Sequence, residues 1–167
     1  LVGESGLVVA NEVIRQRAAT LVDNVRKWGL GNTVVTNSDP SHFAAFRHYF
    51  DLVLVDAPCS GEGMFRKTPE ARNEWSAANV NLCAARSRRI LSDVWDALKP
   101  GGILIYSTCT FNQQEDEETV TWLVEEYGCE SVSVTADPAW GIVQGEVAGC
   151  PTFRFFPHRV QAEGFFA

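Results

Sequence analysis

The chain has 167 residues, of which 46% are hydrophobic and 21% are charged, a composition that suits one globular domain with a sizeable core. Its 14 basic and 21 acidic side chains give a net charge of −7, which excludes a uniformly basic surface, so a polyanionic partner would have to meet a local patch. No apolar run approaches the roughly 18 to 20 residues of a membrane span, and the first residues lack the basic start of a secretory signal, so we expect a soluble, cytoplasmic protein without a membrane partner.

The first third of the chain alternates short apolar runs with one helical segment. "LVVA" at 7–10 predicts a buried strand, and the apolar spacing over 14–28 predicts a helix that stops at Gly29. "TVVT" at 33–36 and "DLVLV" at 51–55 predict two more strands, separated by the turn-forming "NSDP".

The second third continues the alternation. Apolar positions over 80–98 line one face of a long helix, which "KPGG" is expected to end before the strand "ILIYS" at 103–107. A further helix is predicted to begin at Asn112 as N-cap, with Glu115 as its capping-box partner, and to stop at Gly128.

The tail has a different pattern. "SVSV" at 131–134, a loop rich in Gly and Pro, and then "TFRFFPH" and "EGFFA" predict a closing antiparallel β segment. Continuous apolar strands separated by helices indicate an α/β fold, in which a mainly parallel sheet has helices on both faces. We expect a single domain over residues 1–167.

Five cysteines lie far apart in the chain, with no Cys-x-x-Cys pair and no histidine pair nearby. An odd, scattered set does not suit a disulfide framework or a zinc site. We therefore expect free thiols in a reducing compartment and no metal. The cysteines are Cys59, Cys83, Cys109, Cys129 and Cys150.

In parallel α/β sheets, ligands bind beyond the carboxyl ends of the strands, so the residues that follow each strand are the candidate site. Two thiols on neighbouring strand ends are an unusual feature of this set, because a single cysteine is more often an inert core residue. The candidates are Glu12 after the first strand, Asp39 after the second, Asp56, Pro58 and Cys59 after the third, and Thr108 and Cys109 after the fourth.

Some of these residues have two interpretations. Glu12 fits a carboxylate that accepts hydrogen bonds from both hydroxyls of a ribose, or an acid that opens a helix and complements its dipole. Asp39 fits an acceptor for an exocyclic amine, or an Asx turn before Pro40. Pro58 fixes the local backbone, and the glycines after it permit close approach of a ligand.

Three stretches carry a family resemblance: "DAPCSGEGMFRK" at 56–67, "YSTCTFNQQEDEE" at 106–118 and "RFFPHRVQAEGFF" at 154–166. Together they resemble the RNA cytosine-5 methyltransferases of the NOL1/NOP2/Sun family, and "GEGMFRK" is most similar to the bacterial branch that modifies small-subunit ribosomal RNA. The resemblance implies a Rossmann-like class I methyltransferase fold, S-adenosylmethionine as cofactor and RNA, ribosomal RNA in particular, as partner.

The resemblance also implies a role for each candidate. Cys109 corresponds to the nucleophile that attacks carbon 6 of cytosine, and Cys59 to the cysteine that assists release of the methylated product. Asp56 corresponds to the acid that hydrogen-bonds the base edge beside the cofactor. Glu12 corresponds to the residue that holds the cofactor ribose, and Asp39 to the one that holds its adenine.

Substrate contacts are expected next to the Pro-Cys pair. Pro58 shapes the base-binding loop, while Arg66 and Lys67, with Arg72 beyond them, are candidates for holding backbone phosphates near a splayed-out base. Solvated surface charge is the alternative for the three basic residues.

The chain also departs from the family. Its first strand and Gly-rich cofactor turn would lie before Leu1, so we expect 1–167 to be an incomplete catalytic domain. Two other functions stay open: a noncatalytic RNA- or protein-binding module that keeps the fold, and a cysteine hydrolase that pairs Cys59 or Cys109 with His158.

Overall fold

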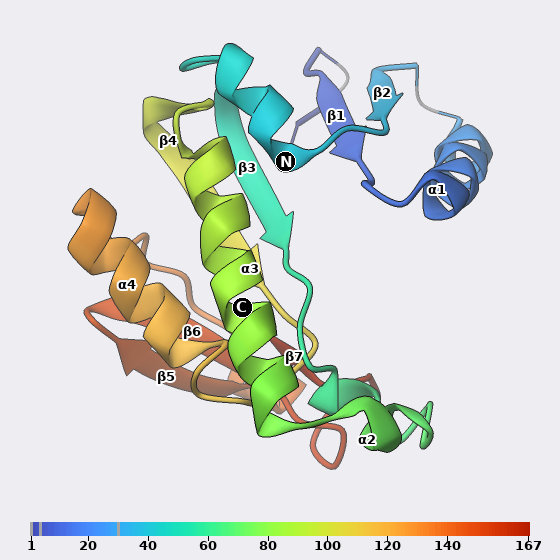
Figure 1. The fold of residues 1–167 in the computed structure, drawn as a ribbon. Coiled ribbons are helices and arrows are strands. Elements are labelled where there is room, and N and C mark those ends of the chain that lie inside the picture. The colour runs from blue at the N-terminus through green and yellow to red at the C-terminus, as the bar shows by residue number, and fades with distance from the viewer. Residues whose placement is uncertain (1, 4, 30) are drawn as a thin grey trace.

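A computed structural model describes residues 2–3, 5–29 and 31–167. Its first unit is a parallel strand pair with one helix: β1 (Val8–Asn11), α1 (Arg15–Trp28) and β2 (Thr33–Thr36). Gly29 ends α1 in the left-handed conformation at φ 71°, as the stop signal predicted. Figure 1 shows this unit beside the rest of the molecule.

A second parallel pair forms the centre of the fold. It consists of β3 (Phe50–Asp56) and β4 (Leu98–Ser107), joined by the long helix α3 (Ala77–Trp95) that runs along them (Figure 1). The register is regular from Leu52 opposite Ile103 to Asp56 opposite Ser107. Both strands therefore end at the same level, with their following loops side by side.

The "KPGG" segment behaves differently from the prediction. The helix already ends at Trp95, and Lys99 to Gly102 belong to β4. Gly101 takes a left-handed φ of 76°, and the pairing with β3 shifts register opposite Phe50 and Leu52. The turn residues thus make an irregularity inside a strand rather than a separate loop.

The parallel strands are confirmed, but they form two pairs. Among the described residues no ladder joins the β1–β2 pair to the β3–β4 pair. Apolar side chains on both pairs are exposed, including Val34 on β2 and Leu54 on β3.

The chain closes with an antiparallel sheet. Its strands are β5 (Val143–Val147), β6 (Cys150–Phe155) and β7 (Phe165–Phe166), and Phe166 also bridges to Thr108 just after β4. The closing segment is confirmed, but 131–134 is not a strand, and β5 lies where a loop was expected. Ala148 and Gly149 make the hairpin turn with φ of 50° and 78°, a turn for which Ala is a weak sequence signal.

The predicted start of the last helix was wrong. Helix α4 (Glu117–Tyr127) begins five residues after Asn112, whose side chain instead accepts from the backbone N–H of Gln114. Glu115 turns into the interior and makes no capping box. Short helical turns complete the fold: η1 (Pro40–Ala45), η2 (Glu62–Met64), α2 (Ala71–Glu74) and η3 (Pro138–Trp140).

The core lies between the β3–β4 pair, α3, α4 and β7. Burial of these apolar side chains fixes both helices and β7 against the central pair. Trp95 and Tyr127 extend the core by stacking with ring centroids 4.1 Å apart. The core cluster consists of Val55, Ala57, Leu91, Tyr106, Leu123 and Phe166.

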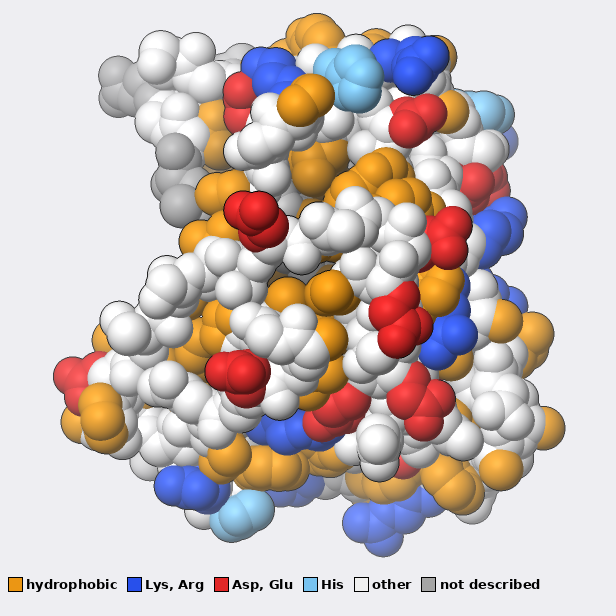
Figure 2. Space-filling model, turned by 90° about the vertical axis from the view of Figure 1, so that its left-hand side faces the viewer, with side chains coloured by type: hydrophobic (Ala, Val, Ile, Leu, Met, Phe, Trp, Pro, Cys, Tyr) orange, Lys and Arg blue, Asp and Glu red, His pale blue; other side chains and the backbone are white. Residues whose placement is uncertain are grey.

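The surface agrees with the acidic composition. Figure 2 shows acidic side chains across the middle of one face and basic side chains mainly towards its edges. Among the residues that the structure describes, none of the helices combines the length and hydropathy of a bilayer crossing. The same residues contain no cluster of three or more His, Cys, Asp or Glu arranged to hold a metal ion.

Backbone hydrogen bonds join the loop after β3 to the loop after β4 and to the end of the chain. The Gly63 N–H donates to the Cys109 carbonyl at 2.9 Å, and the Gly164 N–H donates to the Gly63 carbonyl at 3.1 Å. A Cβ on Gly63 would lie 2.4 Å from the Gly164 carbonyl oxygen.

We therefore expect Gly63→Ala to lower the free energy of unfolding by about 1–3 kcal/mol, because two backbone segments would have to separate. Urea denaturation measures the change. Gly31→Ala is the matched control, because a Cβ at Gly31 meets nothing within 4 Å. Equal stability of the two variants would contradict the close contact.

Candidate active site

Two thiols meet where β3 and β4 end. The Cys59 Sγ lies 3.1 Å from the Cys109 Sγ, and the Cys109 N–H donates to the Cys59 sulfur at 3.3 Å. Both cysteines are free and half-buried. The strand register explains the meeting, since Cys59 and Cys109 follow the paired residues Asp56 and Ser107 by three and two positions.

The two thiols differ in acidity. A hydrogen bond from the Cys59 S–H to the Cys109 sulfur lowers the pKa of Cys109, although burial opposes this effect. The same interaction with Cys109, together with burial, raises the pKa of Cys59. The contact thus favours ionisation of one thiol of the pair while the other stays protonated, and the thiolate is the nucleophilic form.

Asp56 and Pro58 flank the thiol pair. Asp56 is exposed at the end of β3, where the Ser107 hydroxyl lies 3.4 Å from its carboxylate. The Pro58 carbonyl accepts from the Ser87 hydroxyl at 3.2 Å, which ties this loop to α3. The structure thus brings three predicted residues, Asp56, Cys59 and Cys109, to one place.

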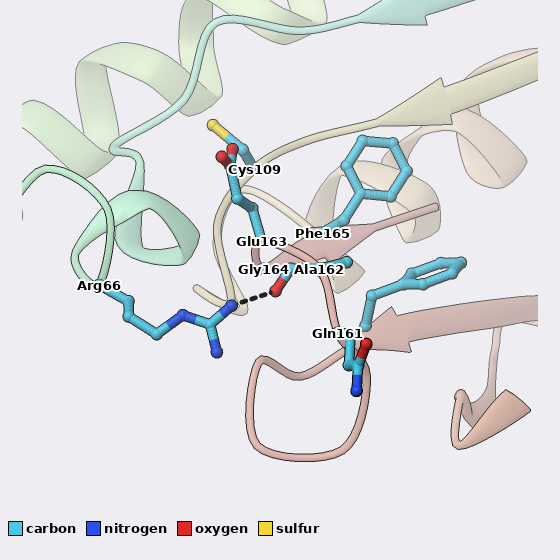
Figure 3. A pocket seen from close by; sticks show the side chains of 8 residues that line it. Arg66, Cys109, Gln161, Ala162, Glu163, Gly164 and Phe165 are labelled. Atoms are coloured by element: carbon cyan, nitrogen blue, oxygen red, sulfur yellow. Dashed lines mark hydrogen bonds between the residues drawn. The ribbon is translucent and has the colours of Figure 1, made fainter.

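An open cavity of about 720 Å³ adjoins Cys109. Figure 3 shows the Cys109 side chain at one end of it, with the Glu163 side chain pointing towards the same end. The C-terminal segment supplies most of its wall. The lining residues are Arg66, Cys109, Phe155, Gln161, Ala162, Glu163, Gly164 and Phe165.

Of the three predicted phosphate-binding residues, Arg66 lines this cavity, Lys67 pairs with Glu163 of its lining, and Arg72 lies 5.8 Å from the centre of the Phe65 ring. The Arg66 guanidinium donates to the carbonyls of Pro157 at 2.9 Å and Ala162 at 2.7 Å, the second of which is drawn in Figure 3. Lys67 forms an ion pair with Glu163 at 2.6 Å. Their charges hold the C-terminal loop against the site.

Glu12 and Asp39 lie at the ends of the other strand pair. Glu12 borders a second cavity of about 340 Å³, accepts from the Ile14 N–H at 2.9 Å and pairs with Arg17 at 3.1 Å. Asp39 forms an Asx turn, since its carboxylate accepts from the N–H and the hydroxyl of Ser41. These bonds lower the pKa of Asp39.

The histidine alternative has no geometric support. His158 stacks on Phe156 with ring centroids 5.6 Å apart, and no hydrogen bond joins it to either thiol among the described residues.

Two buried acids behind the thiols were missed by the sequence analysis. Glu115 and Asp116 are both 0% exposed. Glu115 accepts from the N–H and the hydroxyl of Ser60, while Asp116 accepts from the Thr108 hydroxyl at 2.7 Å. The sequence analysis placed Glu115 in a capping box, and local sequence offers no signal that Glu115 and Asp116 point inward.

Arg154 on β6 supplies a positive charge next to the buried acids. It lies 3.4 Å from the Asp116 carboxylate, pairs with Glu117, and its guanidinium stacks 5.1 Å from the centre of the Phe166 ring. Burial nevertheless raises the pKa of Asp116 to about 8, while the Thr108 bond and the Arg154 charge oppose the shift.

The family model described as 16S rRNA methyltransferase RsmB/F matches residues 1–167. The ribosomal RNA small subunit methyltransferase F of Pectobacterium atrosepticum is 39% identical over 164 residues, which are 96% of this chain and 34% of that protein. The chain therefore spans about a third of the length of the curated relatives it matches.

Solved structures share the fold. The crystal structure of PH0851 superposes with a TM-score of 0.84 at 27% identity, covering 98% of this chain and 36% of that one. NSun6 from Pyrococcus horikoshii, solved with SFG, has a TM-score of 0.72 at 22% identity, covering 98% and 40%. The predicted methyltransferase fold class is confirmed.

The pKa of Asp116 leads to a prediction about stability. The folded state holds the proton of the Asp116 carboxyl more tightly than the unfolded chain does. The stabilisation from this protonation is therefore complete below about pH 4 and is lost as the pH rises through about 8. We expect the free energy of unfolding to fall between pH 6 and pH 9, by up to about 1.4 kcal/mol per pH unit. Urea titrations of the wild type and of Asp116→Asn, which mimics the protonated acid, should differ in this slope. If the pH profiles of the two proteins run parallel, Asp116 is ionised throughout this pH range and the prediction is wrong.

Proposed function

Because the chain belongs to the RsmB/F family of 16S rRNA methyltransferases, we propose that it transfers a methyl group from S-adenosylmethionine to carbon 5 of a cytosine in small-subunit ribosomal RNA. The transfer passes through a covalent bond between Cys109 and carbon 6 of the base. The pair of thiols 3.1 Å apart beside an open cavity is the observation that carries this proposal.

The chemistry explains the need for a thiol. Carbon 5 of cytosine is a poor nucleophile, and addition of the Cys109 thiolate to carbon 6 forms a C–S bond and turns the ring into an enamine. The lowered pKa of Cys109 favours the attacking thiolate. Asp56, exposed beside the thiols, hydrogen-bonds the base edge and stabilises the charge that develops in the ring.

A second thiol serves the return step. Once carbon 5 carries the methyl group, the proton on carbon 5 must leave so that the double bond to carbon 6 re-forms and the C–S bond breaks. Cys59 lies in contact with the Cys109 sulfur and assists this proton removal and elimination.

The cofactor site is assigned to the strand ends. Glu12, at the cavity beside β1, would hold the ribose, Asp39 at the end of β2 the adenine, and Asp56 the side nearest the thiols. A carboxylate held by Ile14 and Arg17 beside a cavity fits a ribose, and bound S-adenosylmethionine would supply the methyl group. NSun6, which shares the fold, was solved with SFG, an analogue of this cofactor.

Ribosomal RNA is the proposed partner, met in the cytoplasm. A target base would be splayed out to reach Cys109, with Pro58 shaping the loop around it. Arg66 at the cavity and Lys67 next to it in the chain would hold the backbone phosphates, and the Lys67 ammonium would leave Glu163 to pair with a phosphate.

A noncatalytic binding module remains the second candidate. The separation of the two parallel pairs favours it, because residues assigned to the cofactor lie on both pairs. Methyl transfer distinguishes the two functions.

We expect Cys109→Ser to abolish transfer of tritiated methyl groups to 16S ribosomal RNA, because the hydroxyl is a far weaker nucleophile. Cys59→Ser should instead accumulate a covalent protein–RNA adduct, visible on a denaturing gel. The assay uses the chain itself and a chimera in which it replaces the matching segment of the Pectobacterium relative.

Cys129→Ser, at a half-buried thiol that donates to the Leu123 carbonyl, is the control and should methylate normally. An adduct with Cys109→Ser rather than Cys59→Ser would reverse the two assignments. If the chimera and the chain, with Cys59 and Cys109 both intact, bind RNA but transfer no methyl group, the noncatalytic binding module is the correct function.

A further inference from the structure

A buried hydrogen-bond group lies directly behind the two thiols. The Glu115 carboxylate accepts from the Ser60 N–H at 2.7 Å and from the Ser60 hydroxyl at 2.5 Å. The Ser60 oxygen also lies 2.9 Å from the Thr110 hydroxyl oxygen. Ser60 and Thr110 are the residues that immediately follow Cys59 and Cys109.

The hydroxyl hydrogens determine which groups can donate within this hydrogen-bond group. Ser60 donates its one hydroxyl hydrogen to the Glu115 carboxylate, which leaves the Ser60 oxygen free to accept from the Thr110 hydroxyl. A single carboxylate thus links the loop after β3 to the loop after β4.

The adjacent acid holds the other side of Cys109. Thr108 donates to Asp116, and Thr110 is linked to Glu115 through Ser60, so both neighbours of Cys109 are tied to the two acids that precede α4. Thr108 and Thr110 are 0% exposed, while Cys109 between them is half-buried and lines the cavity. The backbone bends at Cys109, where the Thr110 N–H donates to the Thr108 hydroxyl at 3.3 Å, so the turn that carries Cys109 to the cavity is anchored on both sides.

We propose that Glu115 is a positioning residue, which holds the Cys59 and Cys109 sulfurs in contact and aims Cys109 at the cavity by clamping Ser60 and, through it, Thr110. This inference rests on the proposed function for its catalytic meaning, but the geometry it concerns is independent of RNA and cofactor.

The burial of Glu115 favours a positioning role over direct contact with the reacting groups. Glu115 is fully covered, and its backbone carbonyl is held by the Tyr106 hydroxyl at 2.6 Å. A carboxylate in this environment is costly unless it is hydrogen-bonded, so its two bonds to Ser60 are strongly maintained. Such a clamp orients neighbouring groups without touching the substrate.

The negative charge of Glu115 and its clamping of Ser60 have opposite effects on the pKa of Cys109, so the proposal can be tested. The Glu115 charge by itself raises the pKa of Cys109, whereas the contact with Cys59 lowers it and is the larger effect. Removing the charge alone would make Cys109 more acidic. Loosening the clamp would separate the sulfurs and make Cys109 less acidic.

The experiment measures alkylation of Cys109 by iodoacetamide in the intact chain, followed peptide by peptide by mass spectrometry across the pH range in which thiols titrate. With Glu115→Gln we expect Cys109 to react about tenfold more slowly at neutral pH, corresponding to a rise of one pKa unit. Glu118→Gln removes the same charge from an exposed position of α4 and should leave the rate unchanged.

Faster or unchanged alkylation of a folded Glu115→Gln chain would overturn the proposal. If thermal melts show that this variant does not fold, Ser60→Ala decides, because it removes only the hydroxyl link: slower alkylation supports the clamp, and an unchanged rate refutes it. Since alkylation needs neither RNA nor S-adenosylmethionine, failure of methyl transfer with a normal alkylation pattern would contradict the proposed function alone.

Discussion

The parallel register of β3 with β4 is the constraint on which the site depends. Because Asp56 pairs with Ser107, the two strands end together, and the residues that follow are placed side by side although 50 positions separate Cys59 from Cys109. Burial of Leu91 and Phe166 against this pair fixes α3 and β7 around it. The thiol contact is therefore a consequence of sheet pairing.

Strand ends alone do not orient side chains, and here a second layer does so. Glu115 and Asp116 lie behind the thiols and bind hydroxyl groups on the residues next to them. Burying two acids is unfavourable, and this chain offsets the cost with hydroxyl donors and Arg154. The same buried acids and their donors therefore contribute to stability and hold the geometry of the site.

The C-terminal segment completes the site from the opposite side. Backbone contact between Gly63 and Gly164 brings it against the Pro-Cys loop, and Arg66 holds its carbonyls. The cavity beside Cys109 exists only because residues from the middle and the end of the chain meet there. A family signature spread over three distant stretches is understandable, since each stretch forms one wall.

The sequence by itself determined the four parallel strands and helices α1 and α3, since apolar periodicity and glycine stops reflect local physics, and it identified both thiols and Asp56 by their place after a strand. Tertiary structure alone decided that Glu115 and Asp116 point inward, that Arg66 and Lys67 bind the C-terminal loop, and that β5 is a strand. The local pattern of "EDEE" equally suits a solvated helix turn. Only the donors brought to it from Ser60 and Thr108 make burial favourable, and those contacts depend on how distant segments pack.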